Sequence, residues 1–184
     1  MHVLGVAGSL RRNSYNRRLL RSTQELLPAG YGFRFLGGLA AVPPYNEDVD
    51  RKSVPAAVGR LRTAINRAQW LIIATPEYNG SVPGVLKNAL DWASRPFPDN
   101  CLHGKPALVI GASSGYFGAA WAQADLRRIL KVAGARVIDH AIAPVRAEYD
   151  FDDRGHLVSE TAKADVSAAL EVLLAEATAE WAAP

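Results

Sequence analysis

The sequence has few of the residues and runs that mark several large classes of protein. A single cysteine, Cys101, occurs in 184 residues, which excludes an internal disulfide framework and a multi-cysteine metal cluster. The longest apolar runs, residues 71–74 and 107–112, have the length of strands and fall far short of the ~20 residues of a membrane helix. Near the start, Arg11 and Arg12 follow an apolar segment, whereas a secretory signal carries its basic residues first. We therefore expect a cytoplasmic protein that does not enter a membrane.

Composition and charge are those of an ordinary globular chain. Apolar residues make up 49% of the sequence and charged residues 21%, which excludes a wholly disordered protein. Lysine and arginine number 21 against 18 for aspartate and glutamate, so the net charge is only +3. Because that excess is small, the position of the arginines matters more than their number, and no nucleic-acid partner is expected. We expect one domain over residues 1–184, since no repeat, low-complexity tract or linker interrupts the chain.

Apolar strands alternate with amphipathic helices along the chain. Strands are predicted at residues 3–6, 31–36, 70–75, 106–112 and 135–139. Helices are predicted at residues 14–27, 54–67, 83–94, 118–133 and 161–181, and a loop at residues 37–50. Strands that are apolar throughout are buried on both faces, which favours a parallel α/β sheet with helices on both sides. We predict a flavodoxin-like, doubly wound, three-layer fold with strand order 2-1-3-4-5, whose ligand site lies in the loops after strands one, three and four.

The loop after the first strand, residues 8–16, reads Gly-Ser-Leu-Arg-Arg-Asn-Ser-Tyr-Asn. Two hydroxyls, an amide, two guanidinium groups and the free N–H groups of a helix start converge there, which indicates a phosphate site. The dinucleotide pattern Gly-x-Gly-x-x-Gly and the Walker loop are both missing, so a terminal phosphate monoester fits better than a pyrophosphate. The alternative is that Ser14 or Asn13 is a simple helix cap and the arginines are solvated.

The loop after the third strand, residues 75–84, reads Thr-Pro-Glu-Tyr-Asn-Gly-Ser-Val-Pro-Gly. Pro76 fixes the backbone, and Asn79 with Gly80 predicts a turn that exposes backbone N–H and C=O groups. Such groups can bind the polar edge of a planar heteroaromatic ring, with Tyr78 or an apolar side chain against its face. The alternative is a plain turn before a helix.

Together these segments make the sequence similar to the NADPH-dependent FMN reductase family, which includes flavodoxin-like quinone, azo-dye and chromate reductases. The resemblance rests on the loop at residues 8–16, on Thr-Pro-Glu-Tyr-Asn-Gly at 75–80 and on Leu-Lys-Asn-Ala-Leu-Asp-Trp at 86–92. Pro-Pro-Tyr-Asn-Glu-Asp at 43–48 and Gly-Ala-Ser-Ser-Gly-Tyr-Phe-Gly at 111–118 match as well. The resemblance covers nearly the whole chain, and the combination of motifs is specific.

The resemblance implies a role for each matching residue, and it implies no catalytic side chain and no metal site. The FMN phosphate would be held by Ser9, Arg11, Ser14, Asn16 and the backbone of Tyr15. The isoalloxazine ring would be lined by Pro76, Glu77, Tyr78 and Asn79. The pyrimidine edge of the flavin would lie near Ser113 and Gly115.

The resemblance also implies an oligomeric assembly, and the sequence departs from the family pattern at one place. In the family, helix three and its neighbours form a two-fold interface, so we expect a homodimer or homotetramer. Trp92 would be either an anchor of that interface or ordinary core. Where the family commonly has Gly-Gly-x-Arg, residues 118–121 read Gly-Ala-Ala-Trp. We expect local contacts at Trp121, to a partner subunit or to the nicotinamide cofactor, to differ from those of the family.

The activity implied by the resemblance is an FMN-dependent NAD(P)H oxidoreductase. Hydride would pass from NADPH, or from NADH, to bound FMN. Two electrons would then pass to a small-molecule acceptor such as a quinone, azo compound, free flavin or metal oxyanion, with ping-pong kinetics. The alternatives are a flavodoxin-type electron carrier and a flavin-binding redox sensor, neither with nicotinamide turnover of its own. The basic charge and Arg11 argue against the carrier, since such carriers are usually strongly acidic.

Several other residues receive a plain interpretation. The four histidines are scattered without metal-ligand spacing. Cys101 has no positioned base that would make it a nucleophile. The acidic residues at 150–153 predict a solvated turn. The arginines of the second predicted helix are expected on a solvated face, and these are Arg60, Arg62 and Arg67.

Overall fold

The computed structural model describes residues 1–115, 117–140, 142 and 145–181. Its main sheet has five parallel strands in the order β2-β1-β3-β4-β6. The strands are β1 (His2–Ala7), β2 (Gly32–Phe35), β3 (Trp70–Ala74), β4 (Pro106–Ile110) and β6 (Arg136–Val137). Because β6 is the fifth strand of this sheet along the chain, the predicted order 2-1-3-4-5 is confirmed.

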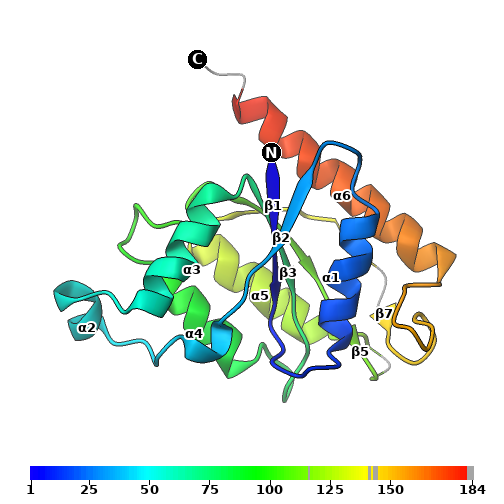
Figure 1. Ribbon diagram of the computed structural model, residues 1–184, viewed down its shortest axis with the longest axis horizontal. Helices are drawn as coiled ribbons and strands as arrows, with labels where there is room; N and C mark the ends of the chain where they lie inside the picture. Colours follow the sequence, from blue (N-terminus) through cyan, green and yellow to red (C-terminus); the bar gives the residue numbers. More distant parts are fainter. Residues whose placement is uncertain (116, 141, 143–144, 182–184) are drawn as a thin grey trace.

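Helices cover both faces of the sheet, as predicted (Figure 1). One face carries α1 (Tyr15–Glu25) and α6 (Glu160–Trp181), and the other carries α3 (Ala56–Arg67), α4 (Gly84–Ala93) and α5 (Ala120–Val132). Along β3 the side chains alternate, so Leu71 and Ile73 pack toward α3 and α4 while Ile72 packs toward α1 and α6. All of β3 and β4 is buried, which explains their uninterrupted apolar sequence. In the described part of the chain, no helix combines the length and the apolar character needed to cross a bilayer.

Two parts of the prediction are wrong in detail. The segment 37–50 is not entirely loop, because it contains a 3-10 helix, η1 (Leu39–Ala41), and the start of α2 (Glu47–Lys52). Helix α2 buries no residue, so it has no apolar face for periodicity to detect. The fourth predicted strand also ends early, and β5 (Ala112–Ser113) pairs with β7 (Val145–Arg146) in a separate two-stranded sheet. The break falls at Gly111, where a Cβ atom would lie 2.9 Å from the Gln123 side chain.

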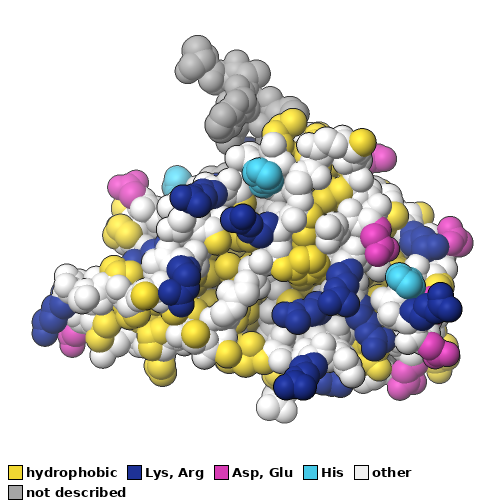
Figure 2. All heavy atoms as spheres, viewed as in Figure 1, with side chains coloured by type: hydrophobic (Ala, Val, Ile, Leu, Met, Phe, Trp, Pro, Cys, Tyr) yellow, Lys and Arg dark blue, Asp and Glu magenta, His cyan; other side chains and the backbone are white. Residues whose placement is uncertain are grey.

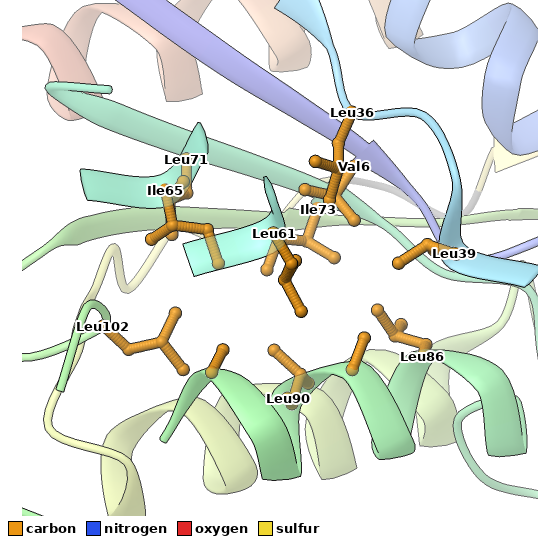
Figure 3. A pocket seen from close by; sticks show the side chains of 12 residues that line it. Val6, Leu36, Leu39, Leu61, Ile65, Leu71, Ile73, Leu86, Leu90 and Leu102 are labelled. Atoms are coloured by element: carbon orange, nitrogen blue, oxygen red, sulfur yellow. The ribbon is translucent and has the colours of Figure 1, made fainter. Parts of the chain in front are cut away.

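A small cavity lies inside the core between the sheet and helices α3 and α4 (Figure 3). Its volume is about 10 Å³, and every side chain that lines it is aliphatic. A cavity of this size without polar partners stays dry. It is therefore a packing gap and not a ligand site. Open α/β sheets of this kind bind ligands at the carboxyl edge of the sheet.

Candidate functional site

The loops after β1, β3 and β4 meet at one edge of the sheet, the lower edge in Figure 1. The Gly8 N–H donates to the Ala74 carbonyl at 2.8 Å, and the Thr75 N–H donates to the Ile110 carbonyl at 3.0 Å. A Cβ atom at Gly8 would lie 2.9 Å from the end of the Leu86 side chain and 3.3 Å from the Pro76 ring, so little space remains between Gly8 and its neighbours. At this edge, the strand order reverses between β1 and β3. Open α/β sheets bind ligands at such a reversal.

The strand-one loop presents buried hydroxyls and free helix donors. Ser9 and Ser14 are 7% and 3% exposed. The Ser14 hydroxyl accepts from the Arg17 N–H at 3.3 Å and so caps α1, which confirms the capping alternative for Ser14. Among the described residues, no acceptor takes the backbone N–H of Tyr15 or Asn16. Capping and anion binding are therefore compatible here, because these two donors remain available.

Asn16 is placed differently from its expected position beside a phosphate. Its side chain is 2% exposed and forms two hydrogen bonds with the backbone of Ala112. The amide nitrogen donates to the Ala112 carbonyl, and the amide oxygen accepts from the Ala112 N–H, both at 2.9 Å. The Asn16 side chain thus holds the strand-one loop against β5. Of its polar groups, only the backbone N–H at the start of α1 is left to bind an anion. No local sequence signal reveals a partner 96 positions away.

Positive charge gathers on this side of the molecule. Basic side chains lie over α1 and the loop before it (Figure 2). The first turn of α1 contains no acidic residue. The arginines of this stretch are Arg11, Arg12, Arg17, Arg18 and Arg21. Cations at a helix start are unfavourable, because the positive end of the helix dipole lies there. An anion bound at this position would be stabilised both by the arginines and by the dipole.

The loop after β3 forms a tight hairpin. Tyr78 and Ser81 exchange two backbone hydrogen bonds of 3.0 and 3.2 Å. The two residues between them, Asn79 and Gly80, have φ angles of 52° and 75°, as a type I′ turn requires. The turn predicted at Asn79 and Gly80 is therefore confirmed. Pro76 is buried under the loop, whereas the Tyr78 side chain is 48% exposed.

Two side chains fasten this hairpin to the start of α5. The Glu77 carboxylate accepts from the Ala122 N–H at 3.1 Å, so it serves as a helix cap. The Ser81 hydroxyl donates to the Asp125 carboxylate at 2.5 Å. That bond, with the nearby Arg128 guanidinium, lowers the pKa of Asp125 below its usual value. Sequence reasoning missed Ser81 and Asp125, because neither stands out in its local segment.

The third loop turns back on itself beside the hairpin. The Ser113 hydroxyl accepts from the Gly115 N–H at 3.0 Å, and the Gly118 N–H donates to the Gly115 carbonyl at 3.2 Å. Tyr116 of the motif at 111–118 lies outside the described residues. Ala119, the residue before α5, has a φ angle of 64°, which is strained for a residue other than glycine. The loop therefore holds Ser113 and Gly115 close together at the same edge.

The segment 42–50 is tied to α4 on the other side of the edge. The Pro43 carbonyl accepts from the Trp92 indole N–H at 2.7 Å and from the Asn88 amide at 2.9 Å. The Tyr45 N–H donates to the Asn88 side chain at 2.8 Å. Trp92 is fully buried within the chain and packs against the Tyr45 ring, with centroids 5.0 Å apart. Of the two readings left open for Trp92, the structure supports ordinary core.

Arg62 does not lie on a solvated face, so that expectation is wrong. Its guanidinium forms two bonds to the Asp50 carboxylate, at 2.7 and 2.9 Å, and two more to the Trp92 carbonyl. The side chains of Arg62 and Asp50 are only 17% and 12% exposed. The reason is helix α2, which carries Asp50 over the polar face of α3.

The remaining candidates offer no second site in the described residues. Burial raises the pKa of the Cys101 thiol to about 11, so the thiol is protonated at neutral pH and is a poor nucleophile. The described histidine, cysteine and acidic residues contain no group of three that could hold a metal ion. In the acidic turn, Asp150 accepts from the Arg146 N–H and Asp152 contacts His156. These are internal turn contacts, consistent with the solvated turn predicted there.

Comparisons with known proteins agree with this arrangement. The family model for NADPH-dependent FMN reductases matches residues 1–149. An NAD(P)H-dependent FMN reductase of Pseudomonas aeruginosa is 42% identical over 172 residues, which cover 93% of this chain and 92% of that protein. A 2-hydroxy-1,4-benzoquinone reductase of a Burkholderia species is 40% identical over 163 residues, 87% of each chain.

A solved structure gives the same result at the level of the fold. The flavoenzyme NAD(P)H:acceptor oxidoreductase FerB of Paracoccus denitrificans superimposes with a TM-score of 0.86 at 34% identity, and the match covers 97% of each chain. The family match spans β1 to β7 and includes all three loops of the candidate site. The chain therefore belongs to the NADPH-dependent FMN reductase family, and it is an oxidoreductase with FMN as cofactor and NAD(P)H as electron donor.

Proposed function

We propose that the carboxyl edge of the sheet holds FMN, with its phosphate in the strand-one loop. The hydroxyls of Ser9 and Ser14, the backbone N–H groups of Tyr15 and Asn16, and the Arg11 guanidinium would bind the phosphate. The observation that carries this proposal is the pair of free N–H donors at the start of α1, beside buried hydroxyls and exposed arginines. The Asn16 side chain would act through its clamp on Ala112.

The flavin ring would lie between the hairpin after β3 and the loop after β4. Backbone groups of the hairpin from Pro76 to Asn79 would line the ring, with the partly exposed Tyr78 beside its face. Glu77 would contribute through its bond to Ala122, which fixes the hairpin against α5. Ser113 and Gly115 would adjoin the pyrimidine edge. We treat residues 1–184 as one FMN-binding domain.

The proposed reaction transfers two electrons from NAD(P)H to a quinone. NAD(P)H, a proton and the quinone would yield NAD(P)⁺ and the hydroquinone, so that two electrons and two hydrogens are transferred in total. Bound FMN supplies the redox chemistry, since it can take up and release electron pairs. The residues of the three loops would bind and orient the cofactor. We infer that donor and acceptor would use the same site in turn, which gives ping-pong kinetics.

A quinone is the acceptor that the relatives favour. One relative is named for 2-hydroxy-1,4-benzoquinone, and a quinone reductase of Escherichia coli is 41% identical over 140 residues. Azo compounds, free flavin and metal oxyanions are the other acceptors to be compared. A cytoplasmic location and a homodimeric or homotetrameric assembly remain predictions, to be checked by cell fractionation and light scattering.

Stopped-flow reduction of the flavin-loaded protein tests the function most directly. NADPH and NADH are mixed separately with the protein, and bleaching of the flavin absorbance is followed. We expect rapid bleaching by at least one donor and recovery of the oxidised spectrum when 1,4-naphthoquinone is added. Flavin binding without bleaching by either donor would favour an electron carrier or a redox sensor. A protein that binds no FMN would rule out all three functions.

Replacing Arg11 tests the phosphate site. Arg11→Ala is expected to weaken FMN binding by about 1.5–3 kcal/mol, because it removes a charge-assisted hydrogen bond. Isothermal titration of the apoprotein with FMN and with riboflavin, which lacks the phosphate, measures the effect. Only FMN affinity should fall. Arg51→Ala, a control on the exposed helix α2, should change neither affinity. Equal losses for FMN and riboflavin would remove Arg11 from the phosphate site.

A further inference from the structure

We propose that Phe117 and Trp121 form a stacking platform for a planar, uncharged electron acceptor such as a quinone. The inference rests on the proposed function, because it names the chemistry of the acceptor that this edge would bind. The two side chains are 53% and 57% exposed, although both are large and apolar. Their ring centroids lie 5.1 Å apart with the planes tilted by 50°, so together they present one aromatic surface.

Hydrogen bonds place this surface beside the candidate flavin site. Trp121 directly precedes Ala122, whose N–H binds Glu77 of the hairpin. It also lies four positions before Asp125, which accepts the Ser81 hydroxyl from the same hairpin. Residues four apart share one face of a helix, so Trp121 lies on the face of α5 to which the hairpin is bonded. Long helical side chains lean toward the helix start, which directs the indole toward the loop at 111–118.

The chemistry of the pair favours a neutral aromatic ring over an inorganic anion. Aromatic side chains recognise planar rings by stacking and by excluding water from the contact. The nicotinamide donor carries several phosphate charges, which the arginines at residues 11–21 attract. A quinone has no such charge, so its binding depends on apolar surface. Phe117 and Trp121 supply that surface, and they supply no positive charge for an oxyanion such as chromate.

The test compares Trp121→Ala with Trp121→Phe in the flavin-loaded protein. Isothermal titration of the oxidised protein with 1,4-naphthoquinone measures acceptor binding without turnover. Steady-state assays then give KM for naphthoquinone and for ferricyanide, a small trianion of which two are reduced per NAD(P)H. We expect Trp121→Ala to raise Kd and KM for naphthoquinone roughly three- to tenfold, as loss of a stacking contact predicts. Trp121→Phe should stay within about twofold because it keeps an aromatic face.

Three controls separate this effect from a general one. The KM for ferricyanide should not change in either variant. Phe97→Ala removes an aromatic side chain that is 67% exposed on the segment between α4 and β4, and it should leave all these values unchanged. Light scattering at the assay concentration should give the same mass for every variant.

Distinct outcomes would overturn the proposal. Unchanged naphthoquinone binding in Trp121→Ala, or equal losses for naphthoquinone and ferricyanide, would remove the platform from acceptor binding. A change of mass in Trp121→Ala that accounts for the altered KM would assign the pair to contact between copies of the chain. Failure of the unaltered protein to reduce naphthoquinone at all would instead overturn the proposed function.

Discussion

Two segments flank the carboxyl edge of the sheet, and they are built in opposite ways. The segment 42–50, which we call the fixed wall, is held to α3 and α4 by an ion pair, an indole N–H and an amide. The aromatic rim, Phe117 and Trp121, is held at its base but leaves two rings in solvent. The fixed wall places its polar groups inward, where they bind the chain itself. The aromatic rim places apolar groups outward, where more than half of each side chain is exposed.

The contrast between the fixed wall and the aromatic rim separates groups that maintain the structure from groups that are available to bind a ligand. Buried polar groups in the fixed wall have partners within the chain, so they account for its structure. Large exposed aromatic side chains often mark a binding surface, because covering them would gain free energy. Perturbing the fixed wall should therefore change stability, whereas perturbing the rim should change acceptor binding.

The largest effect is expected from breaking the ion pair of the fixed wall. Asp50→Asn keeps the shape of the side chain but leaves the Arg62 guanidinium with an uncompensated charge at a largely buried position. Removing one partner of a buried pair is strongly destabilising, and we expect a loss of about 3 kcal/mol in the free energy of unfolding. Urea denaturation followed by circular dichroism measures it.

Glu47→Gln is the matched control, because it breaks an ion pair in the same helix. Glu47 and Arg51 are 63% and 74% exposed in their side chains, so their pair is surrounded by water. Its loss should change the free energy of unfolding by less than about 0.5 kcal/mol. Similar effects of the two variants would mean that burial of Asp50 and Arg62 does not set the strength of the fixed wall.

The sequence predicted the strands and the hairpin of the site better than it predicted the fixed wall. Apolar runs predicted the strands, because β3 and β4 are buried on both faces. Asn79 and Gly80 predicted the turn of the hairpin, because few residue types adopt positive φ angles. The loops of the site were found by combining strand order with their unusual polar residues.

The fixed wall escaped prediction because single side chains hold it over long sequence separations. The Trp92 indole reaches the Pro43 carbonyl across 49 positions, and outside the wall Asn16 reaches Ala112 across 96 positions. Such contacts leave no periodic pattern in either segment. The carboxylate of Glu77 was likewise expected beside a ring, yet its nearest donor is a helix N–H that only the folded chain brings close.

A smaller effect is expected from the indole bond of the fixed wall. Trp92→Phe removes the N–H that binds the Pro43 carbonyl, and Trp70→Phe is its control. Trp70 is equally buried, but its indole nitrogen has no hydrogen-bond partner among the described residues. Both variants lose similar volume, so their difference reports the bond lost at Trp92 together with the relief of the unpartnered Trp70 N–H. We expect Trp92→Phe to be less stable than Trp70→Phe by about 1 kcal/mol in urea denaturation. Equal stabilities would show that the bond to Pro43 does not hold the wall.

The smallest effect concerns the backbone under the aromatic rim. Ala119 has a φ angle of 64°, a conformation that costs an L-residue with a side chain roughly 1–2 kcal/mol. Glycine removes that cost, although it loses about 0.5–1 kcal/mol through its greater freedom in the unfolded chain. From the middle of each range, Ala119→Gly should raise stability by about 0.75 kcal/mol.

Ala122→Gly, three residues on and inside α5, gives the opposite expectation. Ala122 is buried in regular helix, so glycine there should destabilise the protein by about 1 kcal/mol. Thermal unfolding followed by circular dichroism can resolve the two variants. If Ala119→Gly were as damaging as Ala122→Gly, the positive φ angle would not be a source of strain. If Ala119→Gly raised stability and naphthoquinone binding weakened, the strained alanine would be holding Trp121 in place, because a looser backbone before α5 would let the indole leave the rim.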